Sequence, residues 1–181
     1  MRLLTVILLL AFQSSALGEQ IRLSDIFDPN KAESVTLHAL DGSKTDPPNF
    51  LGFRILGSST STSHNDVAAF FSEIQFELDQ PRSGVTLCFI PRHAVSFPLP
   101  DGNVDVLICY ECENLRIYRN STEVLRTSIS NRSVEKMDAM FREKGLEPAA
   151  PPNKLLELTV DPQAGSLPQT TLRLNGSSTR C

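Results

Sequence analysis

The sequence predicts an α+β fold in which an antiparallel β-meander of about four to six strands carries two helices packed on one face. The first observation is a series of short apolar runs between residues 85 and 126, separated by turn-forming residues. The second is a pair of segments with helical spacing of apolar residues, one on each side of that series. The third is the length of 181 residues with 40% hydrophobic residues, which is enough for one domain with its own core.

Two strand-like segments precede the first expected helix. Ser34–Leu40 ends at the turn pair Asp41-Gly42, and Phe50–Leu56 ends at Gly57. The polar run Ser58–Ser63 that follows is expected to be a loop, because it holds no apolar residue for a strand to bury.

The first helix is expected to begin after Ser63, which stands three residues before Asp66 in a pattern typical of helix N-termini. Apolar residues then recur at helical spacing, which predicts one buried face. These residues are Val67, Phe70, Phe71, Ile74 and Leu78. Gln80-Pro81 ends the helix, and its apolar face is expected to cover a sheet.

The meander and the second helix follow. The expected strands are Val85–Ile90, His93–Leu99, Val104–Tyr110, Leu115–Tyr118 and Glu123–Arg126. Turns are expected at Pro91-Arg92, Pro100–Asn103 and Arg119–Ser121. The second helix is expected from Ser130 or Asn131 to Gly145, with Val134, Met137, Met140 and Phe141 on one face.

The N-terminus has the three parts of a secretory signal peptide. Met1-Arg2 supplies the positive charge, Leu3–Phe12 is a short apolar run, and Ala16 and Gly18 suit positions −3 and −1 of a cleavage site. The mature chain is then expected to begin at Glu19, although a cut after Ala16 fits nearly as well. We therefore expect an exported protein, in the periplasm, at the cell surface or outside the cell, under oxidising conditions.

The remaining chain divides at a composition change. Residues 1–18 are the signal peptide, residues 19–146 a single α+β domain, and residues 147–181 a Pro-rich linker and loosely structured tail with one strand-like stretch, Leu155–Val160. No stretch of the mature chain is long and apolar enough to cross a membrane. The net charge of −4 and the absence of a long Lys/Arg block disfavour nucleic acid as a partner. A protein or an envelope component remains as the expected partner.

Four residues form the constellation that could carry chemistry. Cys88 and His93 are spaced as C-x4-H, and Cys109 and Cys112 as C-x-x-C. Thiolate and imidazole are ligands that Zn²⁺ prefers, so this spacing predicts a zinc-type metal site at Cys88, His93, Cys109 and Cys112.

Two simpler interpretations stand beside the metal site. In an exported chain, Cys88 could form a structural disulfide with Cys109 or Cys112, or the cysteines could be buried thiols. A regular strand would also point Cys109 and Cys112 to opposite faces, so their convergence requires a bulge or turn at Tyr110-Glu111. The C-x-x-C spacing permits redox chemistry as well, but it lies beside a strand of a meander and not at a helix N-terminus, which disfavours a thioredoxin-like site.

The segments CFIPRH and ICYEC together resemble a pattern, CF-x-PRH…IC-x-EC, of small exported bacterial proteins whose activity is uncharacterised. The resemblance covers about Phe50 to Gly145 and is most specific at Cys88, Pro91, Arg92, His93, Cys109, Glu111 and Cys112. It implies a recurring structural unit and no particular activity.

The sequence lacks a complete catalytic set, because no motif orients a third group or an oxyanion hole beside a Cys–His pair. We therefore expect an exported binding or structural module, not an enzyme, with a sheet stabilised by the cysteine cluster. The alternative is a metal or thiol-redox site formed by Cys88, His93, Cys109 and Cys112, with Zn²⁺ as its cofactor in the metal version.

Overall fold

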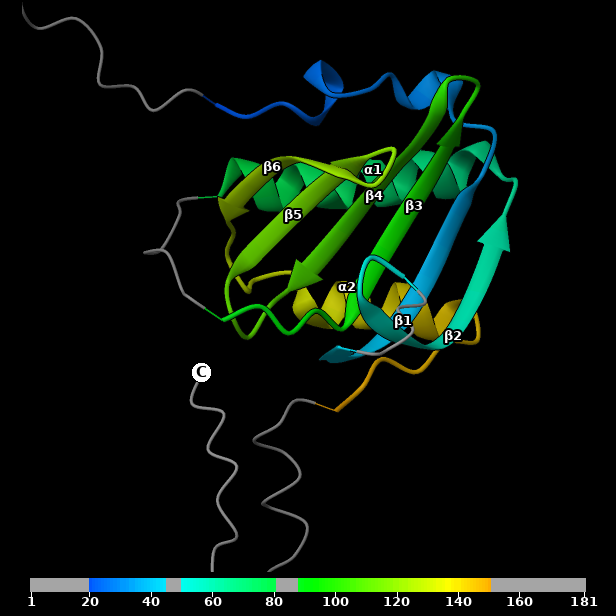
Figure 1. Ribbon diagram of the computed structural model, residues 1–181. Helices are drawn as coiled ribbons and strands as arrows, with labels where there is room; N and C mark the ends of the chain where they lie inside the picture. The colour runs from blue at the N-terminus through cyan, green and yellow to red at the C-terminus, as the bar shows by residue number, and fades with distance from the viewer. Residues whose placement is uncertain (1–19, 45–49, 81–87, 151–181) are drawn as a thin grey trace, which may run out of the picture.

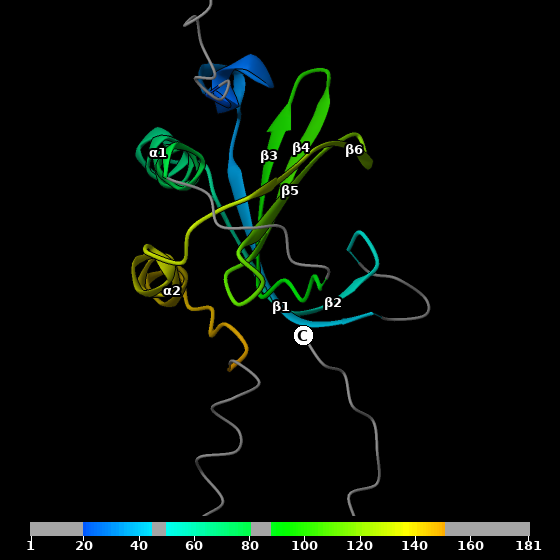
Figure 2. The same ribbon diagram turned by 90° about the vertical axis from the view of Figure 1, so that its left-hand side faces the viewer.

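The computed structural model describes residues 20–44, 50–80 and 88–150, and within them the chain forms one antiparallel sheet with two helices on one side (Figures 1 and 2). The sheet has six strands in the order β2-β1-β3-β4-β5-β6. The strands are β1 Val35–Lys44, β2 Phe53–Ser61, β3 His93–Leu99, β4 Gly102–Cys109, β5 Asn114–Arg119 and β6 Thr122–Ser128. The helices are α1 His64–Asp79 and α2 Val134–Glu143, and short 3-10 turns cover Leu23–Asp25 and Pro29–Lys31. The predicted α+β fold class is confirmed.

Three predictions fall partly or wholly outside the described residues. These are the signal peptide 1–18, most of the strand expected at Val85–Ile90, and the tail from residue 151 onward. The described remainder of that strand, Cys88–Ile90, has no regular secondary structure. In the described part of the chain, no helix is long and apolar enough to span a bilayer.

Tight turns connect β3 to β4 and β5 to β6, because the residues there can adopt the backbone angles that such turns require. Asn120 and Ser121 connect β5 and β6 with φ of 49° and 65°, the backbone that a two-residue hairpin requires. Gly102 begins β4 after the β3–β4 turn with φ of 132°. A Cβ atom at Gly102 would lie 1.8 Å from Oδ1 of Asn120, so only glycine lets the two hairpin ends approach.

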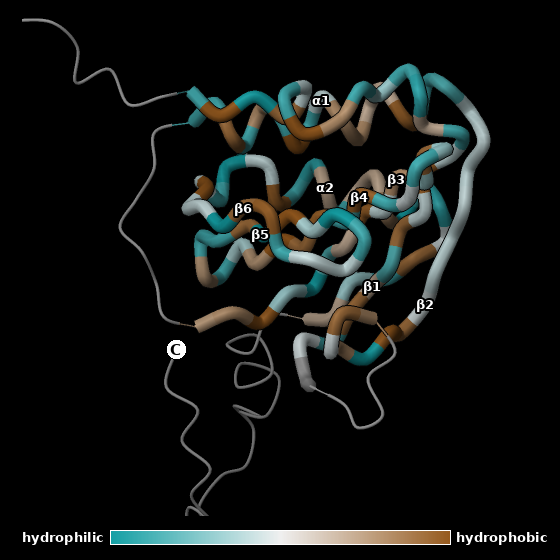
Figure 3. Tube along the Cα trace, turned by 45° about the horizontal axis from the view of Figure 1, so that its top comes forward, coloured by the Kyte–Doolittle hydropathy of each residue, from teal (hydrophilic) through white to brown (hydrophobic). Residues whose placement is uncertain are grey.

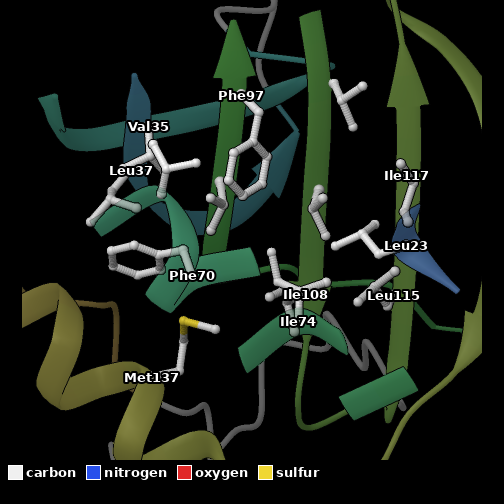
Figure 4. Close-up of a cluster of buried hydrophobic side chains, with 14 of the residues drawn as sticks. Leu23, Val35, Leu37, Phe70, Ile74, Phe97, Ile108, Leu115, Ile117 and Met137 are labelled. Carbon is white, nitrogen blue, oxygen red and sulfur yellow. The ribbon is translucent and has the colours of Figure 1, made fainter. Parts of the chain in front are cut away.

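The core lies between the sheet and the helices. Val67, Phe70, Ile74 and Leu78 of α1 pack onto the strands, and Met137 and Phe141 of α2 extend the same cluster. Figure 4 shows Ile74 beside Ile108, with Phe70 near Leu37, and Figure 3 shows hydrophobic residues both in the strands and along α1. Burial of each such large side chain contributes about 2 kcal/mol, which fixes both helices to one face. The predicted role of the α1 stripe is confirmed.

The polar run after Gly57 corrects one prediction, because Ser58–Ser61 belongs to β2 and is not a loop. Two of its side chains, those of Ser58 and Thr60, bond across to β1. The hydroxyls of Thr60 and Thr36 lie 2.9 Å apart, and Ser58 Oγ lies 2.7 Å from His38 Nδ1. Cross-strand hydrogen bonds of this kind stabilise a strand whose sequence has no apolar alternation.

The two helix N-termini also differ in detail from expectation. Ser63 does precede α1, but its side chain makes no cap bond to any described residue; Ser61 Oγ accepts the Ser63 N–H across 3.2 Å instead and donates to Asp66. The second helix begins at Val134, later than Ser130 or Asn131.

Both edge strands contain a one-residue bulge. Ala39 pairs with Gly57 and Leu40 with Ile55, so Leu56 is the extra residue of β2. Ile117 pairs with Leu125 and Tyr118 with Glu123, so Val124 is the extra residue of β6. Leu56 and Val124 are each 50% exposed.

Candidate functional site

The predicted C-x-x-C pair flanks the turn between β4 and β5. Cys109 is the last residue of β4, and Cys112 lies within the turn that precedes β5. The turn closes with a hydrogen bond from the Glu113 N–H to the Tyr110 carbonyl, and Glu113 has φ of 47°. This reversal brings together two side chains that a continuous strand would separate, and Cys109 and Cys112 form a disulfide.

Cys88 approaches the disulfide from a separate segment. Its half-buried thiol, which belongs to no disulfide in the described chain, donates to Cys112 Sγ across 3.3 Å. Cys109 Sγ accepts the backbone N–H groups of Ile90 at 3.4 Å and Cys112 at 3.2 Å. The three sulfurs therefore form one cluster, which we call the sulfur cluster.

Arg92 fastens the chain beyond α2 to the β4–β5 turn. Its guanidinium is almost fully buried, lies 2.5 Å from Glu111 Oε1, and donates to the Ala149 carbonyl across 2.5 Å. Its backbone N–H bonds to Ile108 of β4, and its carbonyl accepts from Leu40 of β1. A buried guanidinium with a carboxylate and a carbonyl partner ties three parts of the chain together.

His93 is the first residue of β3, and it faces the helices. It pairs with Ile108, so the two side chains share the face that carries the main core. The ring is fully buried, its Nε2 lies 2.7 Å from Asp138 Oδ1, and it meets Tyr110 and Phe141 edge-on.

Burial lowers the pKa of His93 and outweighs the opposing effect of Asp138. The imidazole is therefore neutral at pH 7, and its Nε2–H donates to the carboxylate. Nδ1 has no hydrogen-bond partner among the described residues. Burial acts to raise the pKa of Asp138, but the bond from His93 and nearby positive charges lower it overall. The pair anchors α2 to β3.

The structure brings Cys88, Cys109 and Cys112 together but not His93. Cys109 follows Ile108 in β4, so it points to the face opposite His93. The described residues contain no group of three or more His, Cys, Asp or Glu side chains placed to hold a metal ion. The four-residue zinc site stays a prediction from spacing, without support from this geometry.

Sequence reasoning missed three acidic residues at core-facing helix positions, of which Glu73 and Glu77 are buried and Asp138 is partly exposed. Glu73 and Glu77 of α1 and Asp138 of α2 lie on or beside the apolar stripes, at helical spacing from Phe70 and Phe141. Glu73 pairs with Lys136, and Glu77 accepts bonds from the residues that precede α2. An acidic residue at a core-facing position of a helix was the signal that could have found them.

The second face of the sheet, opposite the helices, is covered by no described helix. A small apolar cluster there contains Leu40, Phe53, Ala94 and Leu107, with half-buried aromatic side chains packed against it. Arg116 lies over the Phe89 ring, with 3.9 Å between Cζ and the centroid. Nearby, Ser96 Oγ donates to Asp105 across 2.6 Å, and burial raises the pKa of Asp105.

The sequence and the structure were compared with known proteins. No family model, curated protein or solved structure matches this chain.

Proposed function

We propose that this chain is an exported module that binds a partner protein through the second face of its sheet. The observation that carries the proposal is the set of half-buried aromatic and arginine side chains on a face that no described helix covers. They are Phe50, Phe89, Arg116 and Tyr118. Aromatic residues and arginine are enriched at protein interfaces because they combine large contact area with a polar group.

The shape of the binding face would depend on residues at the start of β3 and just after the end of β4. Arg92 links the β4–β5 turn to the segment after α2, His93 links β3 to α2, and the disulfide closes the turn. Each of these polar groups is engaged in holding separate segments together. These contacts favour a structural role, in which the residues hold the sheet in shape. Zinc binding at this site is the weaker alternative.

Photo-crosslinking in the producing cells tests the proposal. A benzophenone amino acid replaces Tyr118 on the second face or, as a matched control, Phe76, which is 46% exposed on α1. We expect a discrete protein adduct with the exported chain from position 118 and none from position 76. Equal adducts from both positions, or none from position 118 in a folded, exported chain, would refute binding through this face.

A further inference from the structure

The sulfur cluster holds more than a structural bridge requires. A disulfide that only closes a turn needs two cysteines, yet a third sulfur lies in contact with Cys112. In an oxidising compartment, a thiol at this distance from a disulfide is an exchange partner for it. We propose that Cys88, Cys109 and Cys112 form a thiol–disulfide exchange site that oxidises substrate thiols, with Cys88 as the residue that meets the substrate.

The first step is an internal exchange. The Cys88 thiol loses its proton to solvent, and the thiolate attacks Cys112 Sγ, forming the Cys88–Cys112 bond and breaking the Cys109–Cys112 bond. Cys109 leaves as a thiolate, so the number of disulfides in the protein is unchanged. Backbone N–H groups of Ile90 and Cys112 already point at Cys109 Sγ, and they stabilise the negative charge that develops there.

The second step transfers the oxidising equivalent to the substrate. A substrate thiolate attacks Cys88 Sγ and releases Cys112 as a thiolate, which leaves a mixed disulfide between Cys88 and the substrate. A second substrate thiolate then attacks the substrate sulfur and releases Cys88. Two substrate thiols become one substrate disulfide, and the protein disulfide is reduced to two thiols. A low-molecular-weight disulfide regenerates the site by the reverse reactions.

Accessibility determines which sulfur the substrate reaches. Cys109 and Cys112 are 0% and 1% exposed, whereas Cys88 is half-buried. An external thiol therefore cannot attack the Cys109–Cys112 disulfide directly while the fold is intact. The internal exchange moves the disulfide to the accessible sulfur, which gives the third cysteine a role that packing alone does not.

The experiment uses the mature chain carrying Cys181→Ser, so that the cysteine outside the described residues takes no part. Oxidised protein is mixed with glutathione, quenched in acid, alkylated and mapped by mass spectrometry without reduction. We expect glutathione on Cys88 as the first mixed disulfide. In the Cys88→Ser variant we expect the remaining disulfide to be reduced at least roughly tenfold more slowly, because both its sulfurs are buried.

Two measurements keep the result interpretable. Intact mass and the unfolding midpoint establish that Cys88→Ser retains both the Cys109–Cys112 disulfide and the fold. A Cys109→Ser variant should form the Cys88–Cys112 disulfide on mild oxidation, without any partner. Unchanged reduction in Cys88→Ser, a first glutathione adduct on Cys109 or Cys112, or free thiols in oxidised Cys109→Ser would each overturn the proposal.

Discussion

Replacing Glu77 of α1 tests how the two helices are held together. This carboxylate is fully buried and accepts the Ser133 N–H across 3.1 Å, the Ser133 hydroxyl, and the Ser130 hydroxyl across 2.8 Å. Ser133 is the residue before α2, so a side chain of α1 caps the N-terminus of α2. We compare Glu77→Gln, which keeps one carbonyl acceptor, with Glu77→Leu, which keeps none.

The magnitudes follow from the bonds that each variant loses. Glu77→Leu leaves the buried Ser133 N–H unsatisfied, at a cost of about 2 kcal/mol, and removes two hydroxyl bonds. Allowing about 0.5 kcal/mol for each hydroxyl, which can turn to another acceptor, gives about 3 kcal/mol in total. Glu77→Gln keeps the acceptor for Ser133, but it loses the charge and places an NH2 group where the second oxygen accepts from Ser130, which predicts about 1 kcal/mol.

Urea unfolding at pH 7 gives the free energy of unfolding of both variants and of the parent chain. The values are comparable if the dependence on urea concentration, the m-value, is unchanged. Glu143, an exposed residue of α2, provides the control, since its Gln and Leu variants should lie within about 0.5 kcal/mol of the parent. Hydrogen exchange of the Ser133 amide gives a local readout. A Glu77→Leu variant as stable as the parent, or Gln and Leu variants of equal stability, would refute the capping role.

Three further predictions concern pH and the disulfide. Since burial lowers the pKa of His93 below its unfolded value of 6.5, the unfolded chain gains a proton first and stability should fall as pH drops from about 6.5 to 5. In the His93→Gln variant, the urea midpoint of unfolding should vary less with pH over that range. The same pH dependence as in the parent chain would contradict this prediction. Burial raises the pKa of Asp105, so stability is lost as pH rises through the raised value; Asp105→Asn should stabilise the fold at pH 7 and have little effect near pH 3.5. Reducing the Cys109–Cys112 disulfide should cost only about 2 kcal/mol because the loop it closes is short, and a loss of folding on reduction would show a larger structural role.

Local patterns were sufficient to predict much of the fold. The α1 stripe and the β3–β4 turn depend on residues close in sequence. The stripe lies where its pattern placed it, and the turn, expected at Pro100–Asn103, is Pro100-Asp101, with Gly102 and Asn103 already in β4. The predicted strand ended at Leu56, whereas β2 continues to Ser61. Its polar half is stabilised by β1, through pairs such as His38–Ser58, and not by apolar alternation that the sequence would show. Such partners are chosen by the register between strands, which composition does not reveal.

The same distinction applies to the candidate site. Spacing predicted that Cys88, Cys109 and Cys112 would be associated, and the required turn is present between the last two. The environment of His93 was not predictable, because it depends on which face of β3 the residue occupies and on Asp138, which lies 45 residues further along the chain. A histidine beside a cysteine motif resembles a ligand until the fold assigns it another partner.

The bulges at Leu56 and Val124 affect how this protein behaves at high concentration. Each of the two outer strands departs from regular pairing near its middle, so neither presents a straight row of backbone donors and acceptors to a second molecule. The bulges therefore disfavour continuation of the sheet from one molecule to the next in a constant register. Fibrous polymerisation is opposed at both ends of the sheet, even though each end exposes an apolar side chain.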